Sequence, residues 1–187
     1  GLTAALDHLV RWIAPDAPEG AEFPAADALL VAIGVAHLAS FPLAVWAIAG
    51  PSELALAARV LLFLAFGLYY GQVSNPAAHE LIHRGRRGLV RLGIAVYATM
   101  LNGHHASAHR LVHHRHVATP EDPNTAREGE SFYAFLPRAY LGSFRAGLAA
   151  ERARGNGAIY AAYLAGSGAA LTIGAAVAGV PGVLVWA

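Results

Sequence analysis

The feature that most constrains the fold is an uncharged apolar stretch, ALLVAIGVAHLASFPLAVWAIAG, at residues 28–50. As a helix it is long enough to cross the ~30 Å hydrocarbon layer of a membrane. A second apolar run, residues 54–74, carries only Arg59 near its start. Because the break between the two runs is short, we predict a transmembrane hairpin.

Two further apolar regions follow. Residues 89–101 are too few for a full span and suit a buried or re-entrant helix. Residues 158–187 can form one span and the opening of another, with the break expected at Pro181 and Gly182. Only 13% of the chain is charged, against roughly 25% in soluble domains. We therefore predict an all-α integral membrane protein, in which residues 1–187 form a single membrane domain. Because the chain starts at Gly1 and stops inside an apolar run, we expect it to be a fragment of a longer protein.

Basic residues set the expected orientation. They flank the polar segment at residues 75–154 on both sides, which predicts that this segment is cytoplasmic. The basic residues are Arg84, Arg86, Arg87, Arg91, Arg138, Arg145, Arg152 and Arg154. Within the segment, residues 137–154 mix apolar side chains with arginines, as an amphipathic helix at the membrane interface would. The net charge of +1 gives no reason to expect nucleic-acid binding.

Eight of the ten histidines lie between His79 and His116. The chain has no cysteine, so a bound metal would need nitrogen or oxygen ligands. His79 and His83 are four residues apart, which places both imidazoles on one face of a helix. Taken alone, this HELIH motif is typical of zinc proteases, in which Glu80 would be the general base.

A second histidine group favours two metals. In HRLVHH, His109 and His113 again share a helix face, whereas His114 is turned by about 100° and would face a second metal. A zinc protease site needs only three protein ligands. Neutral imidazoles suit iron, although zinc and manganese accept them too. His8 and His37 are isolated, and we predict ordinary structural roles for both.

Carboxylates near the histidines are candidates for orienting them. A ligating imidazole usually donates its other N–H group to a carboxylate or carbonyl, and Glu80 is next to His79. Glu121 and Asp122 follow the second histidine group. They either orient an imidazole in the same way or are simply solvated charges in a loop. His104 is a further candidate for a hydrogen-bond partner of a metal ligand. His105 and His116 could be metal ligands, partners of ligands or surface groups.

These motifs resemble those of the membrane alkane 1-monooxygenase (alkane hydroxylase) family, within the wider fatty-acid desaturase and hydroxylase superfamily. NPAAHELIH is similar to its NxxHExxH box and HRLVHH to its HxxxHH box. The run VATPEDPNTAREGESFYAFLPRAYLGSFRAGLAAE resembles the segment that follows the second box. The sequence departs from the family at Ala108, where a glutamate is usual, and at Asn102, where a tyrosine is usual. It also lacks the third histidine box and the Asn-Tyr-x-Glu-His segment.

The resemblance implies a transmembrane helix bundle with a cytoplasmic, histidine-rich cap that holds two non-haem iron ions. It implies a multi-pass protein of the bacterial inner membrane that uses O2 to hydroxylate the terminal carbon of medium-chain alkanes. Electrons would come from rubredoxin and its NAD(P)H-dependent reductase, and the surroundings would be membrane lipid. The implied metal ligands in this chain are His79, His83, His109, His113 and His114. Five ligands are too few for a complete di-iron site, so the remainder would lie beyond residue 187.

Other functions remain open on the sequence. The nearest is a membrane fatty-acid desaturase or hydroxylase, or an aromatic-methyl monooxygenase. An intramembrane zinc protease and a metal transporter or sensor are more distant. If the substrate is an alkane, we expect an apolar channel beneath the metals. Some of the side chains that end the second span would border this channel; otherwise they serve only in ordinary helix packing. These side chains are Leu62, Phe66, Tyr69 and Tyr70.

Overall fold

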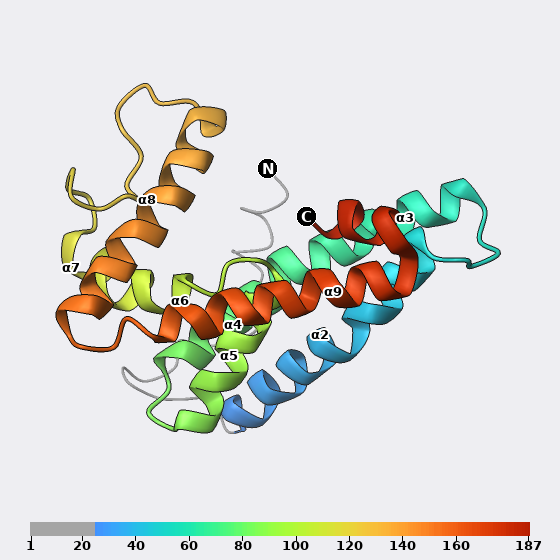
Figure 1. Ribbon diagram of the computed structural model, residues 1–187, viewed down its shortest axis with the longest axis horizontal. Coiled ribbons are helices and arrows are strands. Elements are labelled where there is room, and N and C mark those ends of the chain that lie inside the picture. The colour runs from blue at the N-terminus through green and yellow to red at the C-terminus, as the bar shows by residue number, and fades with distance from the viewer. Residues whose placement is uncertain (1–24) are drawn as a thin grey trace, which may run out of the picture.

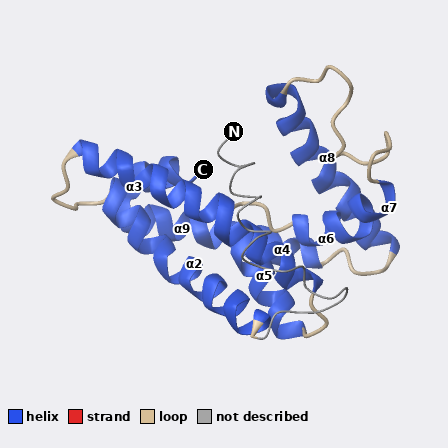
Figure 2. Ribbon diagram, turned by 180° about the vertical axis from the view of Figure 1, so that it is seen from behind, coloured by secondary structure: helices blue, strands red, loops and turns tan. Residues whose placement is uncertain are grey.

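The computed structural model describes residues 25–187, so His8 and the rest of the first 24 residues lie outside the described part. All regular structure within 25–187 is helical (Figure 2). The elements are α2 (Ala26–Ala49), α3 (Leu56–Tyr69), η1 (Tyr70–Ser74), α4 (Asn75–His83), α5 (Arg87–Thr99), α6 (His105–Ala108), η2 (His109–His113), α7 (His114–His116), α8 (Phe132–Ala153) and α9 (Ile159–Trp186). The two η elements are π-helical turns.

Within residues 25–187, three helices are long and apolar enough to span a membrane: Ala26–Ala49, Leu56–His83 and Ile159–Trp186. The predicted all-α membrane fold is therefore confirmed. The second of these helices is continuous from α3 through η1 into α4, so the span leads directly into the first histidine motif (Figure 1). Its α3 part has no buried residue, as expected of a helix that faces lipid or further membrane helices.

The α2–α3 hairpin is closed by Arg59. Its guanidinium group donates hydrogen bonds to the carbonyl oxygens of Ile48 (2.8 Å), Gly50 (3.0 Å) and Leu54 (3.1 Å), and to that of Ser52. The last carbonyl groups of a helix have no partner within the helix. Arg59 therefore caps the end of α2, which explains a charge inside an otherwise apolar run.

Helix α5 is a short buried helix, as the sequence indicated, and it packs closely on α4. Val96 and Tyr97 are fully buried at this contact and against α9. The two helices meet at Gly93, where a Cβ atom would lie 2.9 Å from the carbonyl oxygen of Ala78 and 2.9 Å from the Cβ atom of Leu81. The absence of a side chain at Gly93 thus lets α5 hold the histidine-bearing helix in place.

Helix α9 breaks near its end and folds back toward the bundle (Figure 1). The break falls at Ala178 and Gly179, just before the expected position at Pro181 and Gly182. Gly179 has φ 62° and ψ −148°, a backbone conformation that is essentially restricted to glycine. The returning segment places Trp186 against Phe41, with 4.2 Å between ring centroids, and its indole N–H donates to the carbonyl oxygen of Thr99.

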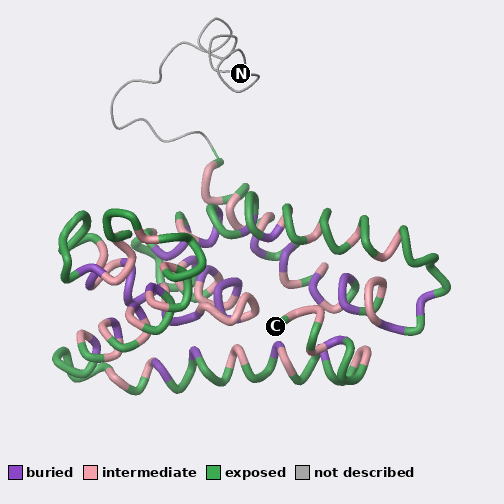
Figure 3. The backbone as a smooth tube through the Cα atoms, turned by 90° about the horizontal axis from the view of Figure 1, so that it is seen from above, coloured by how far each residue is buried: buried purple, intermediate pink, exposed green. Residues whose placement is uncertain are grey.

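Helix α8 runs steeply across α9 (Figure 1). Ser131 caps the N-terminus of α8: its hydroxyl oxygen accepts a hydrogen bond from the backbone N–H of Ala134. One side packs on α6 and η2 through small residues such as Ser143 and Gly147, while Phe132, Tyr133 and Leu136 are exposed. Figure 3 shows the same division along the long helices, with buried residues facing other helices and exposed residues facing outward. An exposed apolar side on a crosswise helix agrees with the amphipathic helix expected here.

Candidate metal centre

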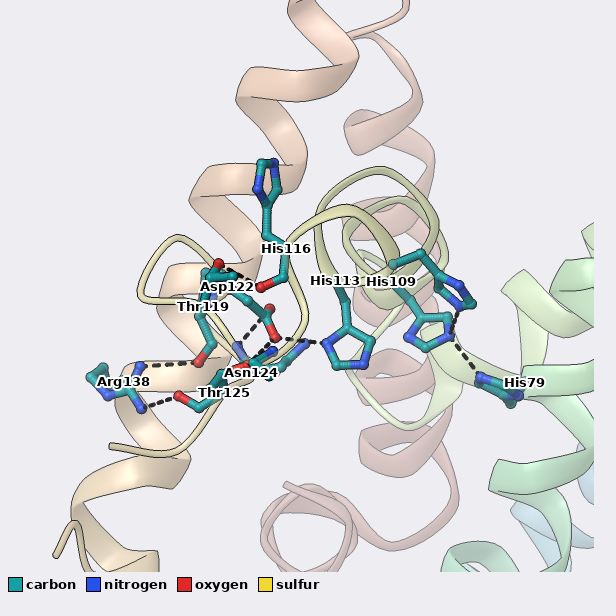
Figure 4. A network of polar contacts seen from close by, with 12 residues as sticks. His79, His109, His113, His116, Thr119, Asp122, Asn124, Thr125 and Arg138 are labelled. Atoms are coloured by element: carbon teal, nitrogen blue, oxygen red, sulfur yellow. Dashed lines mark hydrogen bonds and ion pairs between the residues drawn. The ribbon is translucent and has the colours of Figure 1, made fainter. Parts of the chain in front are cut away.

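Four imidazoles from two separate segments converge on one point. His79 and His83 come from α4, and His109 and His114 come from the second histidine segment; one ring nitrogen of each lies within 4.8 Å of all the others. The Nε2 atom of His109 lies 2.7 Å from Nε2 of His79 and 2.8 Å from Nε2 of His114 (Figure 4). The fold thus brings the two sequence motifs together in one cluster.

The π-helical turn η2 decides which histidines of the second motif meet. The backbone N–H of His114 bonds to the carbonyl oxygen of His109, five residues back. In an α-helix, residues five apart would point roughly 140° from each other, but a turn with i→i+5 hydrogen bonds stacks them. On an α-helix, His109 would share a face with His113, and His114 would point away. The structure keeps His113 stacked on His109, with 5.1 Å between ring centroids, and also brings His114 to His109, at 4.4 Å.

His113 lies outside the group of four but has a specific partner. Its ring is nearly parallel to that of His109, 5.1 Å between centroids. Its Nδ1 atom lies 2.8 Å from an Oδ2 of Asp122 (Figure 4). That carboxylate is fully buried and also accepts from the hydroxyl group of Thr125 (2.7 Å) and the backbone N–H of Asn124 (3.0 Å). Asp122 therefore lies where a carboxylate that orients an imidazole is expected.

These hydrogen bonds keep Asp122 ionised. Burial acts to raise the pKa of this carboxyl group, but the hydrogen bonds from Thr125, Asn124 and His113 outweigh it, and the pKa lies below its usual value. An ionised carboxylate accepts, so Nδ1 of His113 carries the proton. In the neutral form of His113 the free lone pair is then on Nε2, the atom that remains for a metal.

The other candidate partners differ in how closely they approach the cluster. An Oε1 of Glu80 lies 3.6 Å from Nδ1 of His79, beyond direct hydrogen-bond distance but close enough to interact electrostatically. Glu121 is exposed in the loop. His104 is buried away from the four nitrogens, with its ring against Tyr140 (4.8 Å) and Phe144 (5.3 Å).

His105 lies next to the cluster, in contact with His109. Its ring stacks on that of His109 at 4.9 Å, and it lies 4.9 Å from the ring of Tyr97. His105, His109 and His113 thus form a column of imidazoles at four-residue spacing. The four-residue spacing of His105, His109 and His113 is visible in the sequence and would have placed His105 in this column.

The residues fit a metal ion by their chemistry. Burial, with a smaller effect of the neighbouring imidazoles, lowers the pKa of His109 to about 3, so this imidazole is neutral at pH 7. Neutral imidazole nitrogens are suitable ligands for iron and zinc. Two nitrogens on one ion, each at ~2.1 Å, are roughly 3 Å or more apart. The observed spacings of 2.7 and 2.8 Å need only a small outward movement of the rings to reach this.

An apolar cavity of 210 Å³ lies between the spans, lined mainly by residues of α2, α3 and α9. Phe66 and Tyr70 line it, whereas Leu62 and Tyr69 do not, and Phe63 and Gly67 of the same helix take part. Helices rise about 1.5 Å per residue, so Tyr70 is roughly 13 Å from His79 along the chain. The cavity therefore lies within the span that leads to the histidines.

His37 has the structural role that its isolation predicted. Its Nε2 atom lies 2.8 Å from the hydroxyl oxygen of Thr99, and its ring meets that of Tyr70 edge-on at 4.5 Å. The Thr99 hydroxyl donates to the carbonyl oxygen of Val96 (2.7 Å), so it accepts from His37. His37 therefore ties α2 to α5.

Comparison with known proteins identifies the family. The sequence profile of the family described as "Fatty acid desaturase" matches residues 54–187, which include both histidine motifs. The chain belongs to this family. One relative, alkane 1-monooxygenase 2 of Pseudomonas aeruginosa, is 30% identical over 151 residues, which are 77% of this chain and 40% of that protein.

Two further relatives carry similar names. Alkane 1-monooxygenase of Acinetobacter baylyi is 36% identical over 97 residues, which cover 51% of this chain and 23% of the relative. Alkane 1-monooxygenase 1 of Alcanivorax borkumensis is 40% identical over 101 residues, covering 51% and 24%. This desaturase-family chain thus spans less than half the length of these relatives.

Proposed function

We propose that this chain is the histidine-rich part of a non-haem di-iron monooxygenase that hydroxylates the terminal carbon of medium-chain alkanes. The observation that carries the proposal is the convergence of four imidazoles from HELIH and HRLVHH on one point. Family membership supports it. The alkane substrate is supported by relatives that are named alkane 1-monooxygenases.

Each histidine has a role in the proposal. His79, His83, His109 and His114 would hold one iron ion, and Nε2 of His113 would bind the second. Iron bound there supplies the activation of O2 that oxidation of an unreactive C–H bond requires. Asp122 accepts the Nδ1 proton of His113 and so keeps its Nε2 lone pair available.

The membrane helices would handle the substrate. The apolar cavity beside Phe66 and Tyr70 suits a hydrocarbon chain that enters from the lipid. Its apolar lining would hold the chain and exclude water, while the chain end extends toward the imidazoles. Electrons would be supplied on the cytoplasmic side by rubredoxin and its NAD(P)H-dependent reductase, since the histidine cluster lies at the arginine-rich end of the spans.

A membrane desaturase or hydroxylase that acts on acyl chains is the second candidate, because the family profile is that of fatty acid desaturases. The zinc protease is not retained, since its HELIH motif here shares one cluster with His109 and His114. Metal transport is also not retained. Arg59 and His37, the basic side chains inside the first two apolar runs, are engaged in a helix cap and a helix–helix hydrogen bond.

The test combines metal analysis with product analysis. The membrane protein is purified, loaded with iron(II) and supplied with rubredoxin, its reductase, O2 and octane. We expect bound iron and 1-octanol, both lost in His79→Ala and His114→Ala. His116→Ala is the matched control, because His116 is exposed and outside the cluster. An unsaturated product from an acyl substrate would favour the second candidate, and full iron occupancy in His79→Ala would refute the ligand assignment.

A further inference from the structure

We infer that Arg138 on α8 is a positioning residue for the metal centre: it fixes the loop that carries Asp122 and thereby the orientation of His113. This inference rests on the proposed function, in which His113 is a ligand. Arg138 itself touches none of the clustered histidines in the described part of the chain. Its effect would pass through the loop at residues 117–131, which contains no helix or strand.

Arg138 holds the loop at three points, and Figure 4 shows two of its contacts. Its Nη1 donates to the carbonyl oxygen of Pro123 (3.0 Å) and its Nη2 to that of Thr125 (3.1 Å). Its Nε and Nη2 also bond both carboxylate oxygens of Glu130. Glu130 in turn accepts from the backbone N–H of Arg127 (3.0 Å). One planar guanidinium group therefore ties the middle and the end of the loop to the same helix.

A second contact, one turn further along α8, fixes the same part of the loop. A Cβ atom at Gly142 would lie 2.8 Å from the Cβ atom of Pro123. The loop therefore rests directly on the backbone of α8 at Gly142, and Pro123 is adjacent to Asp122. Arg138 and Gly142 together leave Pro123 and its neighbours little freedom to move.

The fixed loop sets the direction of the Asp122 carboxylate. The carboxylate accepts from the Thr125 hydroxyl and from the Asn124 N–H. Arg138 bonds the backbone carbonyl of Thr125, and Asn124 is the residue before it. The carboxylate then has one oxygen directed at Nδ1 of His113 (2.8 Å). If the loop moves, this hydrogen bond is lost and the imidazole is free to rotate or to change tautomer.

The strength of the Arg138–Glu130 contact agrees with an organising role. Hydrogen bonds from Arg138 and from the Arg127 backbone, together with the arginine charge, lower the pKa of Glu130 to about 2. Lysine cannot replace this arginine, because an ammonium group lacks the planar fork that bonds two carboxylate oxygens and two carbonyl groups in fixed directions. Positive charge alone is therefore not sufficient.

The first experiment uses the metal-free protein. Arg127 is exposed in the loop and offers a trypsin site that the loop conformation protects. We expect trypsin to cleave after Arg127 at least several-fold faster in Arg138→Gln and Arg138→Lys than in the unmodified protein. Arg145→Gln is the control, since Arg145 is an exposed arginine on the same helix. Unchanged cleavage in Arg138→Gln would show that Arg138 does not hold the loop.

The second experiment is a double-mutant cycle on iron affinity. Loss of a residue that orients a metal ligand typically weakens binding by about 10- to 100-fold. We expect a loss of this size for the iron ion that His113 would bind, both in Arg138→Gln and in Asp122→Asn. The double variant should bind iron no more weakly than Asp122→Asn alone, because Arg138 acts through Asp122. Additive losses would overturn the inference. Absence of iron from the unmodified protein would instead refute the proposed function, while the trypsin result would still report on Arg138.

Discussion

At the scale of single residues, Gly67 offers a direct test of the substrate route. Gly67 lines the apolar cavity, and a Cβ atom there would meet no atom within 4 Å, so a larger side chain extends into free space. We expect Gly67→Leu to shorten the longest alkane that is hydroxylated while iron content stays unchanged. Each methylene in an apolar pocket contributes only about 1–3 kcal/mol, so the change should be graded. Gas chromatography of the alcohols formed from a series of alkanes measures it.

Gly71 provides the matched control at this scale. It is one turn further along the same span, has open space around its Cβ position and does not line the cavity. Gly71→Leu should therefore leave the length preference as it is. If Gly67→Leu loses turnover for every chain length, or if both variants keep the original preference, the cavity is not where the hydrocarbon lies.

At the scale of elements, the contact between α4 and α5 determines where the first histidine motif stands. We expect Gly93→Ala to force the two helices apart, because its Cβ atom would lie 2.9 Å from the backbone oxygen of Ala78. Overpacking of this kind typically costs about 1–3 kcal/mol, so the melting temperature and the iron content should both fall. Gly88→Ala, on the exposed side of α5 with nothing within 4 Å, should retain both. Equal melting temperatures for the two variants would contradict this account.

At the scale of the whole molecule, the orientation in the membrane remains a prediction from the arginines that flank the histidine-rich segment. The chain has no cysteine, so single cysteines can be introduced and labelled cleanly. In sealed vesicles of known sidedness, Arg86→Cys and Arg127→Cys should react only from the cytoplasmic side. Glu53→Cys, in the α2–α3 connection at the other end of the span, should react only from the opposite side. The reverse pattern would invert the topology.

The sequence by itself determined the spans and the existence of a histidine site. A membrane helix must satisfy its backbone internally and present apolar side chains along its whole length, so residues 28–50 reveal a span without reference to the rest of the chain. The spacing of His79 and His83 is likewise a local property of one helix. Both are signals that a linear pattern can carry.

Only the tertiary structure decided how the site is assembled. The π-helical turn brought His114 to His109 although His113 also stacks on it, since the pattern of residues does not reveal a change from i→i+4 to i→i+5 hydrogen bonding. Asp122 reaches His113 because Arg138, on another element, holds their connecting loop. The contact of His79 with His109 and the bonds from Arg138 to the loop join segments that are separate in the chain, and their geometry depends on how the helices pack rather than on local spacing.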